Sequence, residues 1–462
     1  MDKDRFKDFD EEERQLVLDF ERTVLRGGMQ FFDVDELEVI IDYYLEVGDM
    51  EPLERAVEYA EQLYPDSTTV RLRRAHLLIA KEQYEPARRI VDALRRREPK
   101  NTDVAYSLGV VNGAMGEHEA AVKYYLEAAE DGWQLGRIYA NIAEEYYMLH
   151  ELDEAIRYYK LALDTDSYDD ATLYNYVDTA IQMRCLDDTA AYLQSFVGEH
   201  PYSSAGWHCL GNVYREQGQL EKAVDAYEYA LAIDKNDVAV YYDLAATQEY
   251  AGNPGEAVTT LLRARDIDGN RSEVYRQVAS VYARADNGEM AIMYLRKALE
   301  ENPDDAVTLS SLALAYAFVD EKSLAMPLLK KSLRLAPDNA EVLNAAAVIY
   351  EDLGNYDAAS DYYDRMIAAD GCTESMCQRY VMFLYKQKIY DLLIDFGLES
   401  LELYPEHPFY CTFLAAAYFY TNRYNRASGM LPFVDPVLLA EICPEIIEHP
   451  RLGPLVPPVE ND

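Results

Sequence analysis

Residues 201–234 read PYSSAGWHCLGNVYREQGQLEKAVDAYEYALAID, and the pattern of this stretch recurs along the chain every 34 residues. The same interval separates eleven marks without a slip, namely Pro65, Pro99, Trp133, Ser167, Pro201, Lys235, Gly269, Pro303, Pro337, Gly371 and Pro405. A fixed period of this length is typical of stacked supersecondary units, each of which buries its apolar face on its neighbours. We therefore expect a solenoid of helix pairs.

Small residues occupy two positions of most units, where we expect two helices to approach closely. Ten residues beyond the marks stand Ala75, Gly109, Ala143, Gly211, Ala245, Ala279, Ala313, Ala347 and Ala415. Twenty-two residues beyond them stand Ala87, Ala121, Ala155, Ala223, Ala257, Ala291, Ala325, Ala359 and Ala427. A large side chain follows four residues later, one turn along the same helix face, at Tyr125, Tyr159, Tyr227, Leu261, Leu295 and Tyr363. Small residues are thus predicted to face large ones in each unit.

The turn inside each unit also has a local signal. Gly48, Gly116, Gly218, Gly252, Gly354 and Asn422 share one repeat position. Glycine and asparagine tolerate the left-handed conformation that ends many helices, so we expect the first helix of each pair to stop there. The prolines at the marks cannot continue a helix and therefore separate one pair from the next.

The unit at 201–234 resembles the tetratricopeptide repeat at every signature position of that family, with Trp207-x2-Leu210-Gly211-x2-Tyr214 followed by Ala223-x3-Tyr227. The other units keep most of this pattern over residues 33–433. The resemblance implies an all-α fold, an α-solenoid of about twelve helix pairs wound into a right-handed superhelix. The chain is also similar to the long acidic repeat proteins common in bacteria.

The composition limits the kinds of partner. The chain of 462 residues carries a net charge of −41, and half of its residues are apolar. Binding to nucleic acid requires clustered cations, so we expect no nucleic-acid partner. The charged start, MDKDRFKDFDEEER, is unlike a signal peptide, and no apolar stretch reaches the length of about 20 residues that crosses a bilayer. We expect a cytoplasmic protein without a membrane partner.

No motif for catalysis, metal binding or a cofactor stands out. The six cysteines, Cys185, Cys209, Cys372, Cys377, Cys411 and Cys443, lack metal-ligand spacing. Cys372 and Cys377 form the only close pair, and we interpret all six as structural thiols of a reducing compartment. There is no HExxH pair and no glycine-rich phosphate loop. The sequence predicts a protein that is not an enzyme and holds no cofactor.

One repeat departs from the acidic composition. Residues 67–100 carry ten basic and four acidic side chains, whereas 33–66 carries one basic and twelve acidic ones, and 101–134 carries one and six. The basic side chains are Arg71, Arg73, Arg74, Lys81, Arg88, Arg89, Arg95, Arg96, Arg97 and Lys100. They would either pair with the acidic neighbouring repeats or form a site for an anion or acidic peptide, for which Arg71, Arg73, Arg74, Arg88, Arg89, Arg95 and Arg96 are the candidates.

The resemblance implies that the first helix of each pair lines a concave groove. Residues seven places beyond the marks would face it, namely Leu72, Tyr106, Ala140, Tyr174, His208, Tyr242, Arg276, Ser310, Asn344, Gln378 and Thr412. Residues eleven places beyond would face it too, namely His76, Val110, Glu144, Asp178, Asn212, Ala246, Ser280, Leu314, Val348, Met382 and Ala416. The strongest candidates to bind a partner are Tyr106, Glu144, Tyr174, Asp178, His208, Asn212, Tyr242 and Arg276. The tyrosines would instead fill space between repeats if they are core residues.

We divide the chain into an N-terminal part, 1–32, with a capping helix at about 10–26, the solenoid at 33–433, and a C-terminal part, 434–462. This last part would hold one capping helix at 436–448 and a loose tail from 451. The predicted function is a scaffold that binds a protein segment, basic or aromatic-seeking, in its groove. One alternative is self-assembly into a homo-oligomer through the aromatic end with Phe409, Phe413, Phe419 and Tyr420. Another is a regulatory subunit that holds a separate enzyme.

Overall fold

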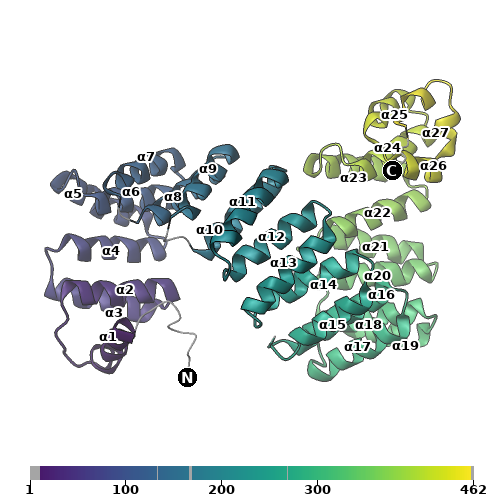
Figure 1. Cartoon of the computed structure of the whole chain (residues 1–462). Coiled ribbons are helices and arrows are strands. Elements are labelled where there is room, and N and C mark those ends of the chain that lie inside the picture. Colours follow the sequence, from purple (N-terminus) through teal and green to yellow (C-terminus); the bar gives the residue numbers. More distant parts are fainter. Residues whose placement is uncertain (1–10, 133, 166–168, 268, 459–462) are drawn as a thin grey trace. The chain divides into compact units, whose positions relative to one another are not determined.

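The computed structural model describes residues 11–132, 134–165, 169–267 and 269–458 (Figure 1). Two of the marks, Trp133 and Ser167, lie outside the described residues. The described segments contain helices and turns and no β-strand. The predicted all-α architecture of repeated helix pairs is confirmed, because twelve pairs follow one another in this part of the chain, from α2 and α3 to α24 and α25.

The chain divides into two compact units, residues 1–247 and 248–462, which we call unit 1 and unit 2. The elements of unit 1 are α1 (Glu11–Arg22), η2 (Val24–Arg26), α2 (Val34–Val47), α3 (Met50–Leu63), α4 (Thr68–Ala80), α5 (Tyr84–Arg97), α6 (Thr102–Ala114), α7 (His118–Ala128), η3 (Ala129–Asp131), α8 (Leu135–Met148), α9 (Leu152–Leu163), α10 (Asp170–Gln182), α11 (Leu186–Glu199), α12 (Ser204–Glu216) and α13 (Leu220–Ile233). The boundary falls within α14 (Val238–Tyr250).

Unit 2 continues the same alternation of first and second helices. Its elements are α15 (Pro254–Ala264), α16 (Arg271–Arg284), α17 (Gly288–Glu301), α18 (Ala306–Phe318), α19 (Lys322–Leu335), α20 (Ala340–Asp352), α21 (Tyr356–Ile367), α22 (Glu374–Lys386), α23 (Tyr390–Leu403), α24 (Pro408–Tyr420), α25 (Tyr424–Met430), η4 (Leu431–Phe433), α26 (Pro436–Ile442), α27 (Pro444–Glu448) and η5 (Gly453–Leu455).

A polar side chain caps the start of most first helices. Ser203 Oγ accepts a hydrogen bond from the Gly206 N–H at 3.0 Å, and Asp33 forms a reciprocal capping box with Glu36. Caps of this kind recur at 34-residue intervals, at Asp33, Ser67, Asn101, Asp169, Ser203, Asp237, Asp305, Asn339 and His407. Each cap satisfies backbone N–H groups that the helix leaves without a partner, which fixes where the pair begins.

The first helix of every pair ends at a residue in the left-handed conformation. These residues are Gly48, Glu82, Gly116, His150, Arg184, Gly218, Gly252, Asp286, Asp320, Gly354, Lys388 and Asn422. At Gly218 the N–H donates to the Arg215 carbonyl, and the next N–H, of Gln219, donates to the Tyr214 carbonyl, which is a Schellman turn. The six predicted positions are confirmed. At the other six positions a residue that is neither glycine nor asparagine adopts the same left-handed conformation. The packing of the helix pair therefore imposes this turn even where the residue type does not favour it.

The small residues and the tyrosines pack as expected. The alanines at the two small positions are 2% exposed or less. Gly211 lies against the Tyr227 ring so closely that an added Cβ would stand 2.5 Å from Tyr227 Cε1, and Gly109 meets Tyr125 in the same way. Tyrosine pairs also stack within several repeats, with ring centroids 5.5 Å apart for Tyr146 and Tyr158, 5.7 Å for Tyr282 and Tyr294, and 5.3 Å for Tyr350 and Tyr362. These contacts join the two helices of a pair.

The ends differ in detail from the sequence prediction. The single capping helix expected at 436–448 is two short helices, α26 and α27, because Pro444 lacks the N–H that would continue the first. The expected N-terminal helix at 10–26 ends at Arg22 and is followed by η2. The described part of the C-terminal tail is not loose, since Leu452 is 3% exposed and Val456 packs on the same core.

The aromatic residues proposed for self-assembly contribute to this core. Phe413 is buried, and Phe409, Phe419 and Tyr420 pack against the apolar cluster of unit 2. The Tyr420 hydroxyl also bonds to Glu445 of α27 at 3.1 Å. These rings therefore stabilise the C-terminal end of the unit itself.

The left-handed turns make a test of the repeat geometry. Gly218→Ala should lower the free energy of unfolding by about 1 kcal/mol, because φ there is 73°, a left-handed conformation that is unfavourable for a residue with a side chain. Nothing lies within 4 Å of the new methyl group, so no steric clash adds to this effect. Gly198→Ala, inside α11 of the same unit and also free of contacts, should raise it by about 0.5 to 1 kcal/mol. Thermal unfolding followed by far-ultraviolet circular dichroism compares the two variants. A stabilising effect of Gly218→Ala would contradict the assigned turn.

Candidate functional site

A groove in unit 2 is lined mainly by the first helices α16, α18, α20 and α22, and its volume is about 740 Å³. Its lining includes Ala279, Ala283, Leu314, Ala315, Phe318, Val348 and Ile349. Phe318, the last residue of α18, is 72% exposed although it lines this hollow. Large apolar side chains left open in a concave, mostly apolar surface are typical of binding sites.

Charged side chains border this groove. Arg276 Nη1 of α16 lies 3.2 Å from Glu341 Oε2 of α20, so this ion pair passes over the intervening first helix. Arg284 Nη2 donates to Glu249 Oε2 at 2.6 Å. Arg379 of α22 lines the groove as well, and no carboxylate of the described residues forms an ion pair with it. The groove therefore offers apolar surface together with one cation that has no carboxylate partner in this part of the chain.

The structure places several sequence candidates at this groove. Arg276, Ser280, Leu314 and Val348 occupy the two repeat positions predicted to face it, and all four line it. The remaining candidates, from Tyr106 to Tyr242, belong to unit 1. They form two hydrogen-bonded groups and an exposed acidic pair.

The first group in unit 1 links successive repeats through His208, which is buried. Its Nδ1 lies 3.3 Å from the Tyr174 hydroxyl, and its Nε2 lies 2.7 Å from Asp243 Oδ2. Arg215 Nη1 donates to the other oxygen of Asp243 at 2.7 Å. Burial alone would raise the pKa of Asp243, but the hydrogen bonds from His208 and Arg215 outweigh burial and lower that pKa. Tyr174 and His208 therefore hold α10, α12 and α14 in register.

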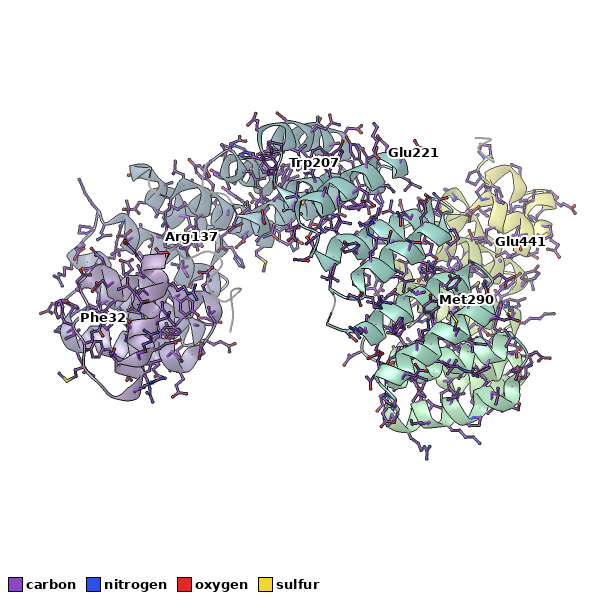
Figure 2. All side chains as sticks on the ribbon, turned by 60° about the horizontal axis from the view of Figure 1, so that its bottom comes forward. Phe32, Arg137, Trp207, Glu221, Met290 and Glu441 are labelled. Carbon is purple, nitrogen blue, oxygen red and sulfur yellow. The ribbon has the colours of Figure 1, made fainter. Side chains whose placement is uncertain are left out.

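The second group includes Tyr106 of α6, which is half-buried. The Tyr106 hydroxyl accepts a hydrogen bond from Asn141 Nδ2 at 3.0 Å, and the Tyr106 ring packs on the Tyr125 ring. The guanidinium of Arg137 in α8, labelled in Figure 2, lies 5.5 Å from the centre of the Tyr106 ring. Among the other candidates, Tyr242 is half-buried, and Asn212 Oδ1 accepts a hydrogen bond from the Tyr227 hydroxyl at 2.7 Å. The hydroxyl of Tyr106 and the amide oxygen of Asn212 are therefore already engaged by neighbouring side chains.

Glu144 and Asp178 are the candidates that remain exposed in unit 1. Asn175 Nδ2 lies 3.5 Å from Glu144 Oε1, at the limit of a hydrogen bond. Although the side chain is accessible, partial desolvation and then the neighbouring carboxylate of Glu145 raise the pKa of Glu144. The carboxylates of Glu144 and Asp178 make the surface around them in unit 1 acidic.

Sequence reasoning missed Asp243, Arg379 and Phe318. Asp243 and Arg379 stand eight places beyond the marks, beside the position that we took to face the groove, as do Arg73, Asn141 and Asn175. Phe318 stands fifteen places beyond its mark, near the end of its first helix. Comparing the residues that stand eight places beyond each mark would have shown that most of them are polar.

The basic repeat is extensively paired with its neighbours. Toward the preceding repeat, Arg73 binds Glu38 and Asp42, Lys81 lies 2.6 Å from Glu54, and Arg74 lies 3.9 Å from Glu61. Toward the following repeat, Arg88 lies 2.8 Å from Glu117, and Arg95 binds Glu127. Arg71 lies 3.4 Å from Asp66.

Arg89 and Arg96 differ from the paired arginines. Both are exposed, and they lie seven residues apart on one face of α5. No carboxylate among the described residues forms an ion pair with either of them. Within the candidate anion patch, these two side chains are available to a partner.

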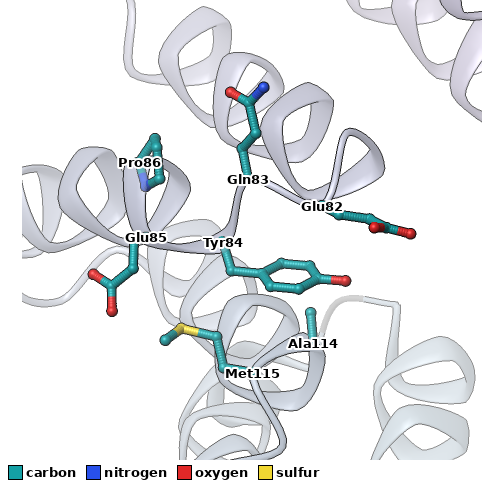
Figure 3. Close-up of a pocket in the computed structure, with 7 residues that line it drawn as sticks. All are labelled: Glu82, Gln83, Tyr84, Glu85, Pro86, Ala114 and Met115. Atoms are coloured by element: carbon teal, nitrogen blue, oxygen red, sulfur yellow. The ribbon is translucent and has the colours of Figure 1, made fainter.

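A second hollow lies between the start of α5 and the end of α6 (Figure 3). The Tyr84 ring lies over Ala114 and Met115, while Glu82 and Glu85 point outward on either side. This hollow lies where two helix pairs stack and offers no converging polar groups, so we assign it no ligand. Within the described segments, no helix could span a membrane, and no group of histidine, cysteine and carboxylate side chains could hold a metal ion.

The repeated helix pairs define a helical-repeat protein, a class of fold suited to protein-protein interaction. Models of the tetratricopeptide repeat match residues 53–109, 102–130 and 310–371, and a TPR repeat model matches 211–252. The chain is a tetratricopeptide-repeat protein, as the signature positions of its sixth repeat indicated.

Several curated proteins are similar to the chain. TPR repeat-containing protein YpiA of Bacillus subtilis (strain 168) is 21% identical over 249 residues, which is 46% of this chain and 58% of that protein. TPR repeat-containing protein MJ1428 of Methanocaldococcus jannaschii is 23% identical over 35% of this chain and 29% of its own length. Superkiller complex protein 3 of Homo sapiens is 23% identical over 48% of this chain and 15% of its length. The chain thus spans from about a seventh to just over half the length of these relatives.

Two solved structures are similar to parts of the chain. MamA is 25% identical with a TM-score of 0.28, and the match covers 34% of this chain and 93% of that one. YrrB, described as a TPR protein with an unusual peptide-binding site, is 20% identical with a TM-score of 0.31, over 40% of this chain and 96% of that one.

The ion pairs of α5 allow a matched test of the basic repeat. The double variant Arg88→Gln, Arg95→Gln should lower the free energy of unfolding by about 0.5 to 2 kcal/mol, and by less in high salt, because it removes two partly screened pairs with the next repeat. The double variant Arg89→Gln, Arg96→Gln changes charge equally on the same helix and should stay within about 0.5 kcal/mol of the parent. Thermal unfolding at low and high salt compares them. Equal losses in the two variants would show that pairing between repeats is not what the arginines contribute.

Proposed function

We propose that this tetratricopeptide-repeat protein is a scaffold, without enzymatic activity of its own, that holds an extended segment of a partner protein in the groove of unit 2. The fold is suited to protein-protein interaction, because within each unit the first helices of successive repeats lie next to one another. The observation that carries the proposal is the exposed ring of Phe318 in an apolar groove of about 740 Å³. Covering such a surface would remove apolar area from water.

The small residues of the repeat keep this groove open. Ala279, Ala283 and Ala315 line it with methyl groups, while Leu314 and Val348 supply larger apolar surface. An apolar side chain of the partner could therefore enter next to the Phe318 ring. In many interfaces a few buried aromatic or apolar side chains near the centre carry most of the affinity, and Phe318 would have this role here.

The charged border supports a preference for one kind of segment. Glu341 and Glu249 are already bound to Arg276 and Arg284, so their charges are largely compensated. Arg379 has no carboxylate partner among the described residues and could bind a carboxylate of the segment. We therefore propose an apolar segment with an acidic residue for this groove. The basic partner expected from the sequence would instead fit the exposed Glu144 and Asp178 of unit 1.

The groove can be tested with a displayed library of random peptides panned against the full chain. Peptides selected on the parent should bind Phe318→Ala about 30-fold more weakly or worse, because an aromatic anchor contributes about 2 kcal/mol or more. Leu403→Ala is the matched control, since Leu403 is 77% exposed in the same unit but does not line the groove. It should leave the affinity unchanged.

The same selection tests the charge preference. Peptides selected on the parent should be enriched in aspartate and glutamate, and this enrichment should disappear when panning uses Arg379→Ala. Calorimetric titration of individual peptides gives the affinities. If Phe318→Ala binds the selected peptides as tightly as the parent does, the unit 2 groove is not the binding site.

A further inference from the structure

Two thiols of unit 2 lie in contact. Cys372 comes directly before Thr373, which precedes the first residue of α22, and Cys377 lies in the second turn of that helix. Their sulfur atoms are 3.7 Å apart, and both residues are partly exposed. All six cysteines carry free thiols, and no other pair of them is in contact within the described segments. This pair is therefore chemically different from the other four cysteines.

The position of the pair in the helix explains the contact. Thr373 is the N-cap residue, so Cys372 lies just outside the helix and Cys377 is its fourth residue. Side chains at these two positions commonly pack on each other across the first turn of a helix. A disulfide bond is about 2.05 Å long, so the sulfur atoms need to approach by about 1.6 Å, which small side-chain rotations can supply.

We propose that Cys372 and Cys377 form a reversible disulfide bond, which makes the start of α22 a redox-responsive site. The oxidant that we invoke is a small-molecule disulfide, the common oxidised partner of cellular thiols. The inference is independent of the function proposed above, because it rests on the two thiols alone.

The reaction is thiol-disulfide exchange in two steps. The Cys372 thiolate attacks one sulfur of the small disulfide, forms a mixed disulfide and releases the first small thiol. The Cys377 sulfur, after loss of its proton to water, then attacks the Cys372 sulfur and releases the second small thiol. The two protein thiols together lose two electrons and two protons, and the small disulfide is reduced to two thiols.

The order of attack follows from the surroundings of the two thiols. Cys372 belongs to the turn before the helix, where a small disulfide can approach it. Desolvation, together with the nearby Cys372 sulfur, raises the pKa of Cys377 to about 12, which makes it the weaker first nucleophile. Within the mixed disulfide, its place beside the target sulfur compensates for this low reactivity.

The disulfide would affect the helix that borders the groove. It would join the turn at 371–373 to α22 across the first helical turn, two residues before Arg379. A covalent link there suppresses fraying of the helix end, since the two positions can no longer separate. The redox state of the pair would thus set how firmly the start of α22 is held.

The test uses the full chain equilibrated with mixtures of reduced and oxidised glutathione, then blocked with an alkylating agent, digested with trypsin and analysed by mass spectrometry. Both cysteines lie in one tryptic peptide, residues 366–379, MIAADGCTESMCQR. We expect this peptide to become lighter by two hydrogen atoms and to lose both alkylation sites together as the mixture becomes more oxidising. Dithiothreitol should restore both sites.

Two comparisons make the outcome decisive. Cys185, which is partly exposed and has no thiol in contact, should gain only a glutathione adduct. In Cys377→Ser the second step is impossible, so the adduct should accumulate at Cys372, and circular dichroism of the variant checks that it is folded. The proposal is overturned if the parent peptide 366–379 carries separate glutathione adducts, or remains fully alkylated, in mixtures that modify Cys185. It is equally overturned if Cys372 or Cys377 forms disulfides only between two chains.

Discussion

The close approach of the two helices in each pair is the constraint on which the rest of the structure depends. Gly211 meets the Tyr227 ring at a distance that leaves no room for a Cβ, and alanines at the equivalent positions are almost completely buried. Since each repeat buries its apolar face only on itself and its neighbours, this contact must be made again in every unit. The caps at the start of the first helices and the left-handed turns at their ends keep the helix lengths constant, so the contact recurs in the same place.

Polar interactions between repeats follow from this regular stacking. Side chains at one repeat position come to lie beside those of the next repeat, as in the contact of Tyr174 with His208 and of His208 with Asp243. The basic repeat uses the same relation, with arginines of α4 and α5 directed to carboxylates on both sides. Partly exposed pairs of this kind contribute little each, so they specify register more than they stabilise the chain.

The same regularity produces different surfaces in the two units. In unit 1 the hydroxyl groups of Tyr106 and Tyr174 are engaged by Asn141 and His208, and the exposed carboxylates nearby are those of Glu144 and Asp178. In unit 2 the tyrosine position holds polar residues such as Arg276, the position four residues later supplies Leu314 and Val348 to the groove, and Phe318 is left uncovered. A single helical framework therefore presents an acidic surface in one unit and an apolar groove in the other, and the side chains at a few repeat positions decide which.

The sequence by itself determined the period, the helix pairs, the small positions at their contact and half of the left-handed turns, because each of these depends on local residue type repeated at 34-residue intervals. Most groove-facing candidates could be assigned only to a repeat position, since periodicity says which face a residue shares and not what lies opposite it. Tertiary structure decided that Arg276 reaches Glu341 over an intervening helix, that Cys372 touches Cys377, and that Lys388 adopts a left-handed turn normally left to glycine. These outcomes depend on the direction and packing of particular side chains in three dimensions, which residue type and spacing do not fix.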